Sequence, residues 1–335
     1  MDVGGLDGFL ADGDFSGVVE LRRDGERLYA GAFGPASRRW DVPNTLETRF
    51  DVASISKLFT AVAVLQLVGS GRLDLDASIH EYADLAGTAI APEVTLRHLL
   101  THTSGIADIA EEDQGENYAA VFAVHPPHAV TRTRDFLPLY AHKPPHFAPG
   151  EGLRYCNAGF LLAGLAVEHA AGRPFPDHVE AEVLAVAGMS RSGYFDKRYA
   201  VPDLAEGFDL DAEGRWEQNV YAYPPRGAAD GGAFCTTGDL HRFLAAVRAG
   251  RLLPPDLTQA FLSPQVSKDD DGEAQGFGLE FDRTGFWKEG CSEGASGILT
   301  HYRTLGIDAA VLANSMQGAW PVVAELDRLA AAAAG

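Results

Sequence analysis

Two strand-rich segments at opposite ends of the 335-residue chain constrain its fold most strongly. Residues 16–33 contain two runs rich in β-forming residues, separated by Asp24-Gly25, a pair typical of a tight hairpin turn. Three more strands are expected late in the chain, at residues 276–282, 294–303 and 306–314. Because helical patterns fill the middle, we predict one sheet built from both ends of the chain.

Helical patterns lie between and after these strands. We expect helices at residues 54–68, 95–105, 158–172, 236–250 and 320–334, with a short one at 133–142. The last of these lies inside residues 107–149, a long loop region of the kind that often carries function. We therefore expect a sheet part at residues 1–71 and 206–335, a mostly helical part at 72–205, and a ligand-binding cleft between them.

The charge balance excludes several classes of partner. The chain has 47 acidic against 27 basic residues, a net charge of −20, so we expect neither nucleic acid nor an anionic membrane as a partner. No apolar stretch approaches 18 residues, and the acidic N-terminus lacks the features of a secretory signal. Three cysteines suggest free thiols in a reducing compartment. These features predict a cytoplasmic location, and they leave the oligomeric state unknown.

The first chemical motif is Ser54-Ile55-Ser56-Lys57, at the start of the longest apolar run. Residues i and i+3 share one face of a helix, so Ser54 and Lys57 are expected to lie side by side. A lysine amine whose pKa is lowered by desolvation can take the proton of a serine hydroxyl. An ordinary N-cap serine with a solvated lysine would give the same pattern, so this pair alone is a weak signal.

Two further motifs follow in the chain. Tyr155 and Asn157, two residues apart in an extended segment, point to the same side. Lys288-Glu289-Gly290 comes later. Shuffled chains of this composition would contain all three motifs in this order in well under about 1% of cases, so the combination is specific.

These motifs resemble those of the serine β-lactamase and DD-peptidase superfamily, closest to class C β-lactamases and family VIII esterases. Other stretches that match are "LLTHTSGI", "FAPGEGLRYCNAGF", "DGGAFCTTGDLHRFL" and "GIDAAVLANS". The resemblance covers about residues 16 to 330. It implies an α/β fold of the α+β type, in which an antiparallel sheet flanked by helices meets an inserted, mostly helical domain.

The resemblance also implies roles for the motif residues. Ser54 would attack a carbonyl to form an acyl-enzyme, while Lys57 and Tyr155 share the acid and base work. Lys288 is the fourth expected catalytic residue and, with Lys57, lowers the pKa of the Tyr155 phenol. Backbone N–H groups of Ser54 and Cys291 would hold the oxyanion. Asn157, Glu289 and Gly290 would contact substrate. No metal or cofactor is implied, and the expected partner is a small ester or amide.

Glu289 departs from the family pattern, in which Thr, Ser or Gly often occupies this position. Glu289 either pairs with Lys288 or Arg303 and is structurally inert, or faces the cleft and repels a substrate carboxylate. In the second case, β-lactams and peptide C-termini are disfavoured relative to neutral esters, amides or amine-bearing substrates. An esterase-like hydrolase is the first prediction. A β-lactamase or D-amino-acid peptidase or amidase is the alternative, and an inactive binding domain is the second alternative.

The histidines and cysteines of the chain are expected to have structural roles. His98 and His102, and His142 and His146, have the i, i+4 spacing of a zinc pair, but structural histidines are the more common case. The thiols near the motifs, Cys156 and Cys291, are interpreted as small packing residues.

Overall fold

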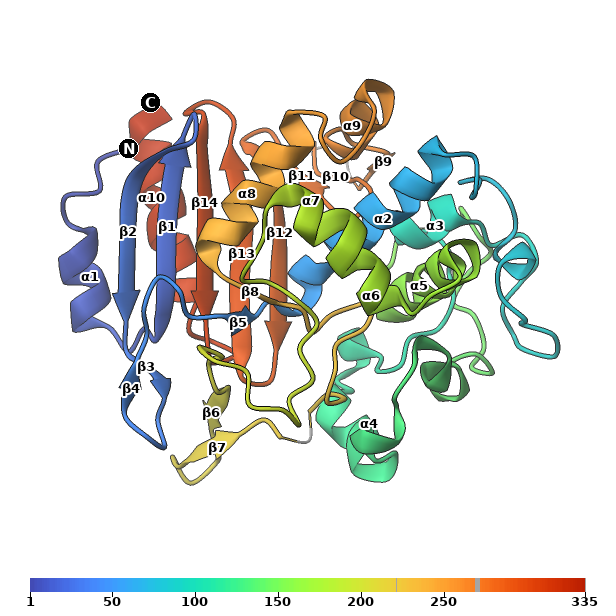
Figure 1. Ribbon diagram of the computed structural model, residues 1–335, viewed down its shortest axis with the longest axis horizontal. Helices are drawn as coiled ribbons and strands as arrows, with labels where there is room; N and C mark the ends of the chain where they lie inside the picture. Colours follow the sequence, from blue (N-terminus) through green and yellow to red (C-terminus); the bar gives the residue numbers. More distant parts are fainter. Residues whose placement is uncertain (221, 269–271, 335) are drawn as a thin grey trace.

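The computed structural model describes residues 1–220, 222–268 and 272–334. Its main sheet has eight strands in the order β2-β1-β14-β13-β12-β11-β10-β9, and every neighbouring pair is antiparallel. Figure 1 shows the blue N-terminal strands beside the red C-terminal ones. The strands are β1 (Gly17–Arg23), β2 (Glu26–Phe33), β9 (Val266–Ser267), β10 (Ala274–Gln275), β11 (Glu280–Phe281), β12 (Gly285–Ser292), β13 (Ala295–Tyr302) and β14 (Ile307–Ala313).

Both faces of this sheet are buried, which its alternating side chains explain. On β1, Val18 belongs to the large hydrophobic cluster, whereas Val19 and Leu21 belong to a smaller cluster on the opposite face. Helices α1 (Leu6–Asp12) and α10 (Trp320–Ala334) supply the smaller cluster. Helix α8 (Thr237–Arg248) packs on the other face of the sheet, where the large hydrophobic cluster lies.

The helical elements lie beside the sheet, on the right of Figure 1. Helices α2 (Lys57–Gly69) and α5 (Asn157–Ala171) pack against each other and are buried over most of their length. The other helices of this region are η1 (Ala53–Ser56), η2 (Ile79–Glu81), α3 (Leu96–Leu100), η3 (Glu112–Gln114), α4 (Tyr118–Val124), η4 (Pro127–Ala129), η5 (Thr133–Leu139), α6 (Phe175–Val179), η6 (Glu180–Leu184) and α7 (Ala185–Ala187).

Short elements complete the fold. Helix α9 (Pro255–Phe261) follows α8, and three two-stranded sheets connect the larger parts. Their strands pair as β3 (Pro35–Ser37) with β4 (Val42–Pro43), β5 (Phe50–Asp51) with β8 (Phe234–Cys235), and β6 (Phe208–Leu210) with β7 (Trp216–Gln218). The β5–β8 pair matters most for the site, because β5 leads directly into η1.

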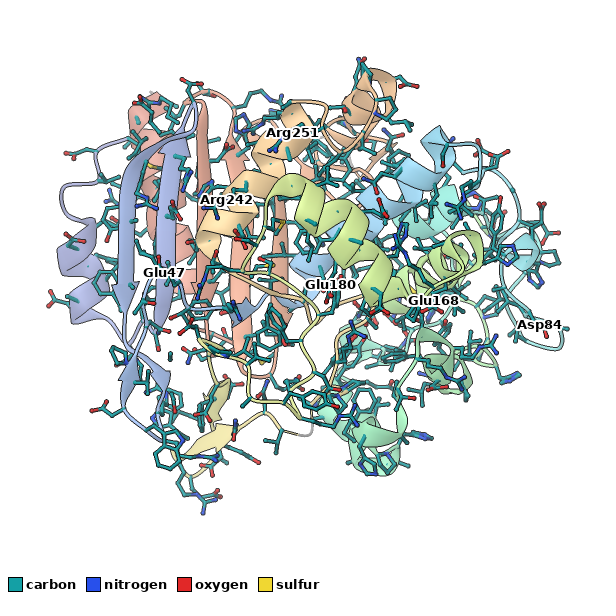
Figure 2. All side chains as sticks on the ribbon, in the orientation of Figure 1. Glu47, Asp84, Glu168, Glu180, Arg242 and Arg251 are labelled. Carbon is teal, nitrogen blue, oxygen red and sulfur yellow. The ribbon has the colours of Figure 1, made fainter. Side chains whose placement is uncertain are left out.

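Two half-buried glutamates on helices accept hydrogen bonds from neighbouring segments. Glu168 accepts hydrogen bonds from the Thr133 hydroxyl at 2.7 Å and from the Phe175 backbone at 3.0 Å. Glu180 accepts one from the Tyr194 backbone at 2.8 Å. Figure 2 shows both glutamates on the central helices. The Glu168 bonds join α5, η5 and α6, and the Glu180 bond joins η6 to the segment that contains Tyr194.

Most of the predicted elements are confirmed. The hairpin turn at Asp24-Gly25 has positive φ at both residues, as this turn type requires. The predicted antiparallel sheet with flanking helices is present, and the helix after Ser54, α5 with its left-handed Gly172 stop, α8 and α10 occur close to their expected positions.

Two predicted elements are wrong in extent, and one strand was not predicted. The helix expected at 95–105 ends at Leu100, because His102 has a φ of +58° and cannot continue a helix. The strand expected at 276–282 is two short strands around a turn at Gly278. Strand β12 was not predicted, because Lys288, Glu289 and the neighbouring glycines weaken its strand pattern.

The division of the chain at residues 71 and 206 stays a prediction, and its last residue, 335, lies outside the described residues. The main hydrophobic cluster includes residues of both parts, among them Val18, Leu161 and Leu312. Among the described residues, no helix has the length and apolar character needed to cross a bilayer.

Candidate active site

Ser54 lies where a strained backbone turns from β5 into helix. Ala53, directly before it, has a φ of +42°, a left-handed value that costs energy for any residue with a Cβ. The Asp51 carboxylate accepts a hydrogen bond from the Ala53 N–H at 2.9 Å, which holds this conformation. The turn leaves Ser54 partly exposed while its neighbours on η1 are buried.

Lys57 is fully buried, with a relative exposure of 0%. Its ammonium group donates to Ser54 Oγ at 2.9 Å, to Asn157 Oδ1 at 2.7 Å and to the main-chain oxygen of Asp230 at 2.6 Å. A buried ammonium needs such partners to offset its loss of water. The predicted proximity of Ser54, Lys57 and Asn157 is therefore present in the structure.

Tyr155 completes the contacts of the serine. Its hydroxyl donates to Ser54 Oγ at 2.7 Å. The Lys57 ammonium lies 5.1 Å from the centre of the Tyr155 ring, and that of Lys288 lies 5.0 Å from it. Both cations stabilise negative charge that develops on the phenol oxygen. Ser54 Oγ is thus in direct contact with two groups that can exchange protons with it.

His102 supports the Tyr155 ring. The two rings are 4.6 Å apart between centroids, and His102 Nδ1 accepts a hydrogen bond from the Cys156 backbone at 3.1 Å. Burial, followed by the charges of Lys288 and Lys57, holds the pKa of His102 well below its usual value, so the imidazole is neutral. A neutral ring can pack against Tyr155 without adding a third cation to the site.

Asp108, which the sequence motifs did not reveal, binds the N-terminus of α5, two residues after Tyr155. Its carboxylate accepts hydrogen bonds from the backbone N–H groups of Asn157 at 2.6 Å and Ala158 at 2.8 Å, the first residues of α5. It also accepts one from Ile109 at 2.7 Å. A remote carboxylate thus does the work of an N-cap, since Cys156 provides no side-chain cap. Burial raises the pKa of Asp108 to about 6, while the N–H donors act in the opposite direction.

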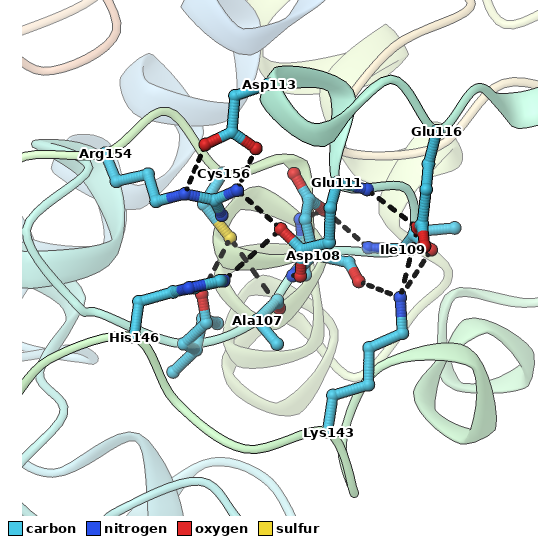
Figure 3. A network of polar contacts seen from close by, with 12 residues as sticks. Ala107, Asp108, Ile109, Glu111, Asp113, Glu116, Lys143, His146, Arg154 and Cys156 are labelled. Carbon is cyan, nitrogen blue, oxygen red and sulfur yellow. Dashed lines mark hydrogen bonds and ion pairs between the residues drawn. The ribbon is translucent and has the colours of Figure 1, made fainter.

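Figure 3 shows the ion network that fixes Asp108. Glu111 accepts a hydrogen bond from the Asp108 backbone at 2.9 Å and pairs with Arg154 at 2.7 Å. Lys143 donates to the main-chain oxygen of Asp108 at 2.7 Å. Because Arg154 immediately precedes Tyr155, this network ties the 107–116 segment to the second motif.

The third motif lies on β12. Lys288 is buried, and its ammonium pairs with Glu280 at 3.2 Å, while Lys268 pairs with the other oxygen of Glu280 at 2.6 Å. Gly290 packs directly on the turn before Ser54: a Cβ at this position would lie 2.2 Å from the main-chain oxygen of Val52. Only glycine allows this approach.

Cys291, next to Gly290, directs its backbone N–H toward one edge of β12. Strand β11 pairs only with Phe286 and Trp287, so the following edge of β12 has no strand partner among the described residues. The Gly285 oxygen accepts a bond at this edge, and the register continues unbroken to Ser292. Alternate residues of an antiparallel strand direct their backbone groups to the same edge, so the Cys291 N–H points there too.

Glu289 does not lie where the sequence analysis expected it. Its exposed side chain lines a cavity beneath α10 with Trp287 and Asp327, on the opposite face of the sheet from Lys288. Successive strand residues point to opposite faces, so Lys288 and Glu289 cannot both face Ser54. The expected substrate contact of Glu289, and the charge selection assigned to it, are therefore not retained.

A cavity of 260 Å³ opens beside Ser54. It is lined by residues of both predicted parts: Asp51, Ala53, Ser54, Glu116, Asn117, Tyr118, Asn157, Ala222, Tyr223, Asp230, Gly231, Gly232, Cys291, Ser292, Glu293 and Met316. A larger cavity of 630 Å³ elsewhere is lined by none of the three motifs. The smaller cavity is therefore the candidate substrate site.

The remaining thiols and histidines have structural contacts. Cys156 and Cys235 are buried, and burial raises the pKa of both thiols, whereas Cys291 is exposed at the rim of the cavity. His98 accepts a hydrogen bond at the start of α3, and His146 lies 3.3 Å from Glu111. Across the described ranges, no group of three or more His, Cys, Asp or Glu side chains could hold a metal ion.

Comparisons with known proteins agree with this geometry. A family model described as Beta-lactamase matches residues 6–334. The chain is 33% identical over 295 residues to esterase EstB of Burkholderia gladioli, covering 78% of this chain and 73% of that protein. It is 29% identical over 280 residues to a D-aminopeptidase of Brucella anthropi, covering 80% of this chain but only 49% of that protein.

Among solved structures, a penicillin-binding protein from Bacillus halodurans matches with a TM-score of 0.91 and 35% identity. The match covers 97% of this chain and 99% of that one. The fold therefore extends over nearly the whole chain, including all three motifs.

Asp108→Ala should lower the free energy of unfolding by at least about 3 kcal/mol, because it leaves three buried N–H groups without an acceptor at about 1–3 kcal/mol each. Chemical denaturation of both proteins measures this change. Asp113→Ala, which removes an exposed carboxylate of the same network, is the matched control and should change the free energy of unfolding much less. Equal losses in the two variants would show that Asp108 does not cap α5.

Gly290→Ala should also destabilise the protein, by about 1–3 kcal/mol, because the new methyl group forces β12 away from Val52 and Ser54. The control is Gly8→Ala in α1, where a Cβ would meet no atom within 4 Å. This substitution should not destabilise the protein. Thermal unfolding of both variants provides the comparison. A Gly290→Ala protein as stable as wild type would contradict the close approach.

Proposed function

The chain belongs to the β-lactamase family of serine hydrolases, and from this premise we propose that it cleaves small esters or amides through an acyl-enzyme on Ser54. One observation carries the proposal: Ser54 Oγ is hydrogen-bonded to both Lys57 at 2.9 Å and Tyr155 at 2.7 Å. A serine hydroxyl is a weak nucleophile unless a neighbouring group removes its proton. Here two such groups are in contact with it.

In the proposed first step, Ser54 Oγ attacks the substrate carbonyl and its proton passes to Tyr155 or Lys57. The three acceptors around Lys57 match the three N–H donors of an ammonium group, which favours Tyr155 as the acceptor of the proton. To accept this proton Tyr155 must first be a phenolate, and Lys57 and Lys288 stabilise that negative charge before the transfer.

The tetrahedral intermediate carries its negative charge on the former carbonyl oxygen. Backbone N–H groups of Ser54 and Cys291 are proposed to hold this oxygen, since the edge of β12 faces the turn that contains Ser54. Tyr155 returns the proton to the leaving alcohol or amine. Water then attacks the acyl group by the reverse sequence and frees Ser54.

An esterase activity is the first proposal for the substrate class. It is supported by the similarity to EstB over 78% of this chain. A D-amino-acid peptidase or amidase is the alternative, supported by the D-aminopeptidase relative, of which the match spans about half the length. The buried, fully bonded Lys57 argues against an inactive binding domain, because such a costly group serves no purpose in passive binding. A cytoplasmic location stays a prediction.

Ser54→Ala should remove labelling by a fluorophosphonate probe and lower kcat for p-nitrophenyl butyrate by at least about 1000-fold, because the nucleophile is lost. Intact-mass spectrometry should detect an acyl-enzyme with the wild type only, across esters, a chromogenic cephalosporin and D-alanyl amides. Ser70→Ala, at the exposed end of α2, is the control and should behave as wild type. Residual activity above about a tenth of wild type in Ser54→Ala would refute the proposal.

Lys57→Ala and Tyr155→Phe should each lower kcat by about 10²–10⁴-fold, the range of positioned proton transfer. Because both side chains contact the same oxygen, the double variant should lose much less than the product of the two single losses. Steady-state kinetics of the four proteins measure this coupling. Strictly multiplicative losses would show that the two residues act independently.

A further inference from the structure

We propose that the cavity beside Ser54 binds an ammonium group, so that the preferred substrates carry a protonated amine or a quaternary nitrogen near the scissile carbonyl. This inference rests on the proposed function and narrows its substrate class. It starts from the charges that line the cavity: Asp51, Glu116, Asp230 and Glu293 are acidic. No Lys, Arg or His is among the lining residues of the described chain.

Asp230 is the centre of this site. Its side chain is buried, with a relative exposure of 2%, and its carboxylate accepts hydrogen bonds from Tyr223 at 2.5 Å and Tyr118 at 3.5 Å. An ionised carboxylate has about four acceptor positions, so these two bonds leave capacity for a ligand. Asp230 itself lines the cavity, together with both tyrosines.

The two tyrosines add an aromatic component. The centroids of the Tyr118 and Tyr223 rings are 5.9 Å apart, and Phe122 and Phe136 pack around Tyr223. A cation near the faces of aromatic rings gains about 0.5–2 kcal/mol from the ring quadrupoles. A carboxylate beside two tyrosines therefore combines the two interactions by which proteins recognise ammonium groups.

The buried Lys57 does not cancel this negative field. Its ammonium bonds the main-chain oxygen of Asp230, and Lys57 is not among the residues that line the cavity, whereas four acidic residues are. Glu116 has an additional partner in Lys143, at 3.9 Å. Burial raises the pKa of Asp230, and an ammonium ligand would offset this cost by pairing with the ionised carboxylate.

The position of Asp230 relates the ligand to the chemistry. Its main-chain oxygen is 2.6 Å from Lys57 Nζ, which in turn is 2.9 Å from Ser54 Oγ. An ammonium group at the Asp230 carboxylate would thus lie within a short side chain's length of the reacting carbonyl. The same carboxylates would repel a substrate carboxylate, a selection that the sequence analysis assigned to Glu289.

Direct binding tests the site without turnover. The Ser54→Ala protein is titrated by calorimetry at low salt with three ligands of similar shape: phenethylammonium, 2-phenylethanol and 3-phenylpropionate. The cation should bind at least about tenfold more tightly than the alcohol, and the anion most weakly. Binding of the cation and alcohol with equal affinity would overturn the proposal.

Single substitutions test which residue of the cavity causes the preference for the cation over the alcohol. Asp230→Asn in the Ser54→Ala background should reduce the cation preference to less than about threefold. Glu293→Gln, in the turn between β12 and β13, should retain most of this preference. If Asp230→Asn does not fold, Tyr118→Leu replaces it: removal of one aromatic face should weaken cation binding by about three- to tenfold and leave the alcohol unchanged. An undiminished preference in whichever of these variants folds would overturn the assignment.

Turnover separates this proposal from the proposed function. Butyrylcholine and its neutral carbon isostere, 3,3-dimethylbutyl butyrate, are compared with the wild type, together with fluorophosphonate labelling. A higher kcat/KM for the choline ester, by at least about tenfold, supports both proposals. Labelling with equal kcat/KM for the two esters would overturn the ammonium site alone. Cation binding without labelling or hydrolysis would overturn the hydrolase and leave the site standing.

Discussion

The buried ammonium group of Lys57 is the interaction on which the rest of the site depends. It joins three segments that are far apart in the chain, because its acceptors belong to η1, α5 and the 230 loop. A charge without water requires all of its partners, so each segment must be in place before the lysine can be buried at an acceptable cost. The same bonds that stabilise the lysine therefore align Ser54, Asn157 and Asp230 around one cavity.

Strained backbone conformations, and the contacts that hold them, surround Lys57. Ala53 and His102 both have left-handed backbone conformations, and each lies beside a proposed catalytic side chain. Such conformations persist only where surrounding contacts enforce them. For Ala53 the contact is the Asp51 carboxylate, and for His102 it is the bond from Cys156 and the packing against Tyr155. The polar network around Asp108 extends this support to the start of α5.

Local periodicity was sufficient to place part of the site from sequence. The i, i+3 spacing of Ser54 and Lys57 and the i, i+2 spacing of Tyr155 and Asn157 depend only on backbone geometry, and the structure brings these side chains together. Asp108 and Asp230 could not be found this way, since the contacts of Asp108 with α5 and of Asp230 with Tyr118 join residues separated by 49 to 112 positions. Glu289 was misplaced because its orientation depends on the parity of β12, a strand whose pattern is too weak to predict.

The position of β1 between β2 and β14 affects how the protein is made. Its partner strands are β2, which follows at once, and β14, which begins at Ile307. A ribosome that adds about 5–20 residues per second needs on the order of 15 to 60 s to reach β14 after completing β1. During that time the finished hairpin exposes an open edge that can pair with the wrong strand. Holdase chaperones that cover this edge on the nascent chain should therefore raise the yield of folded protein more than those that act after release.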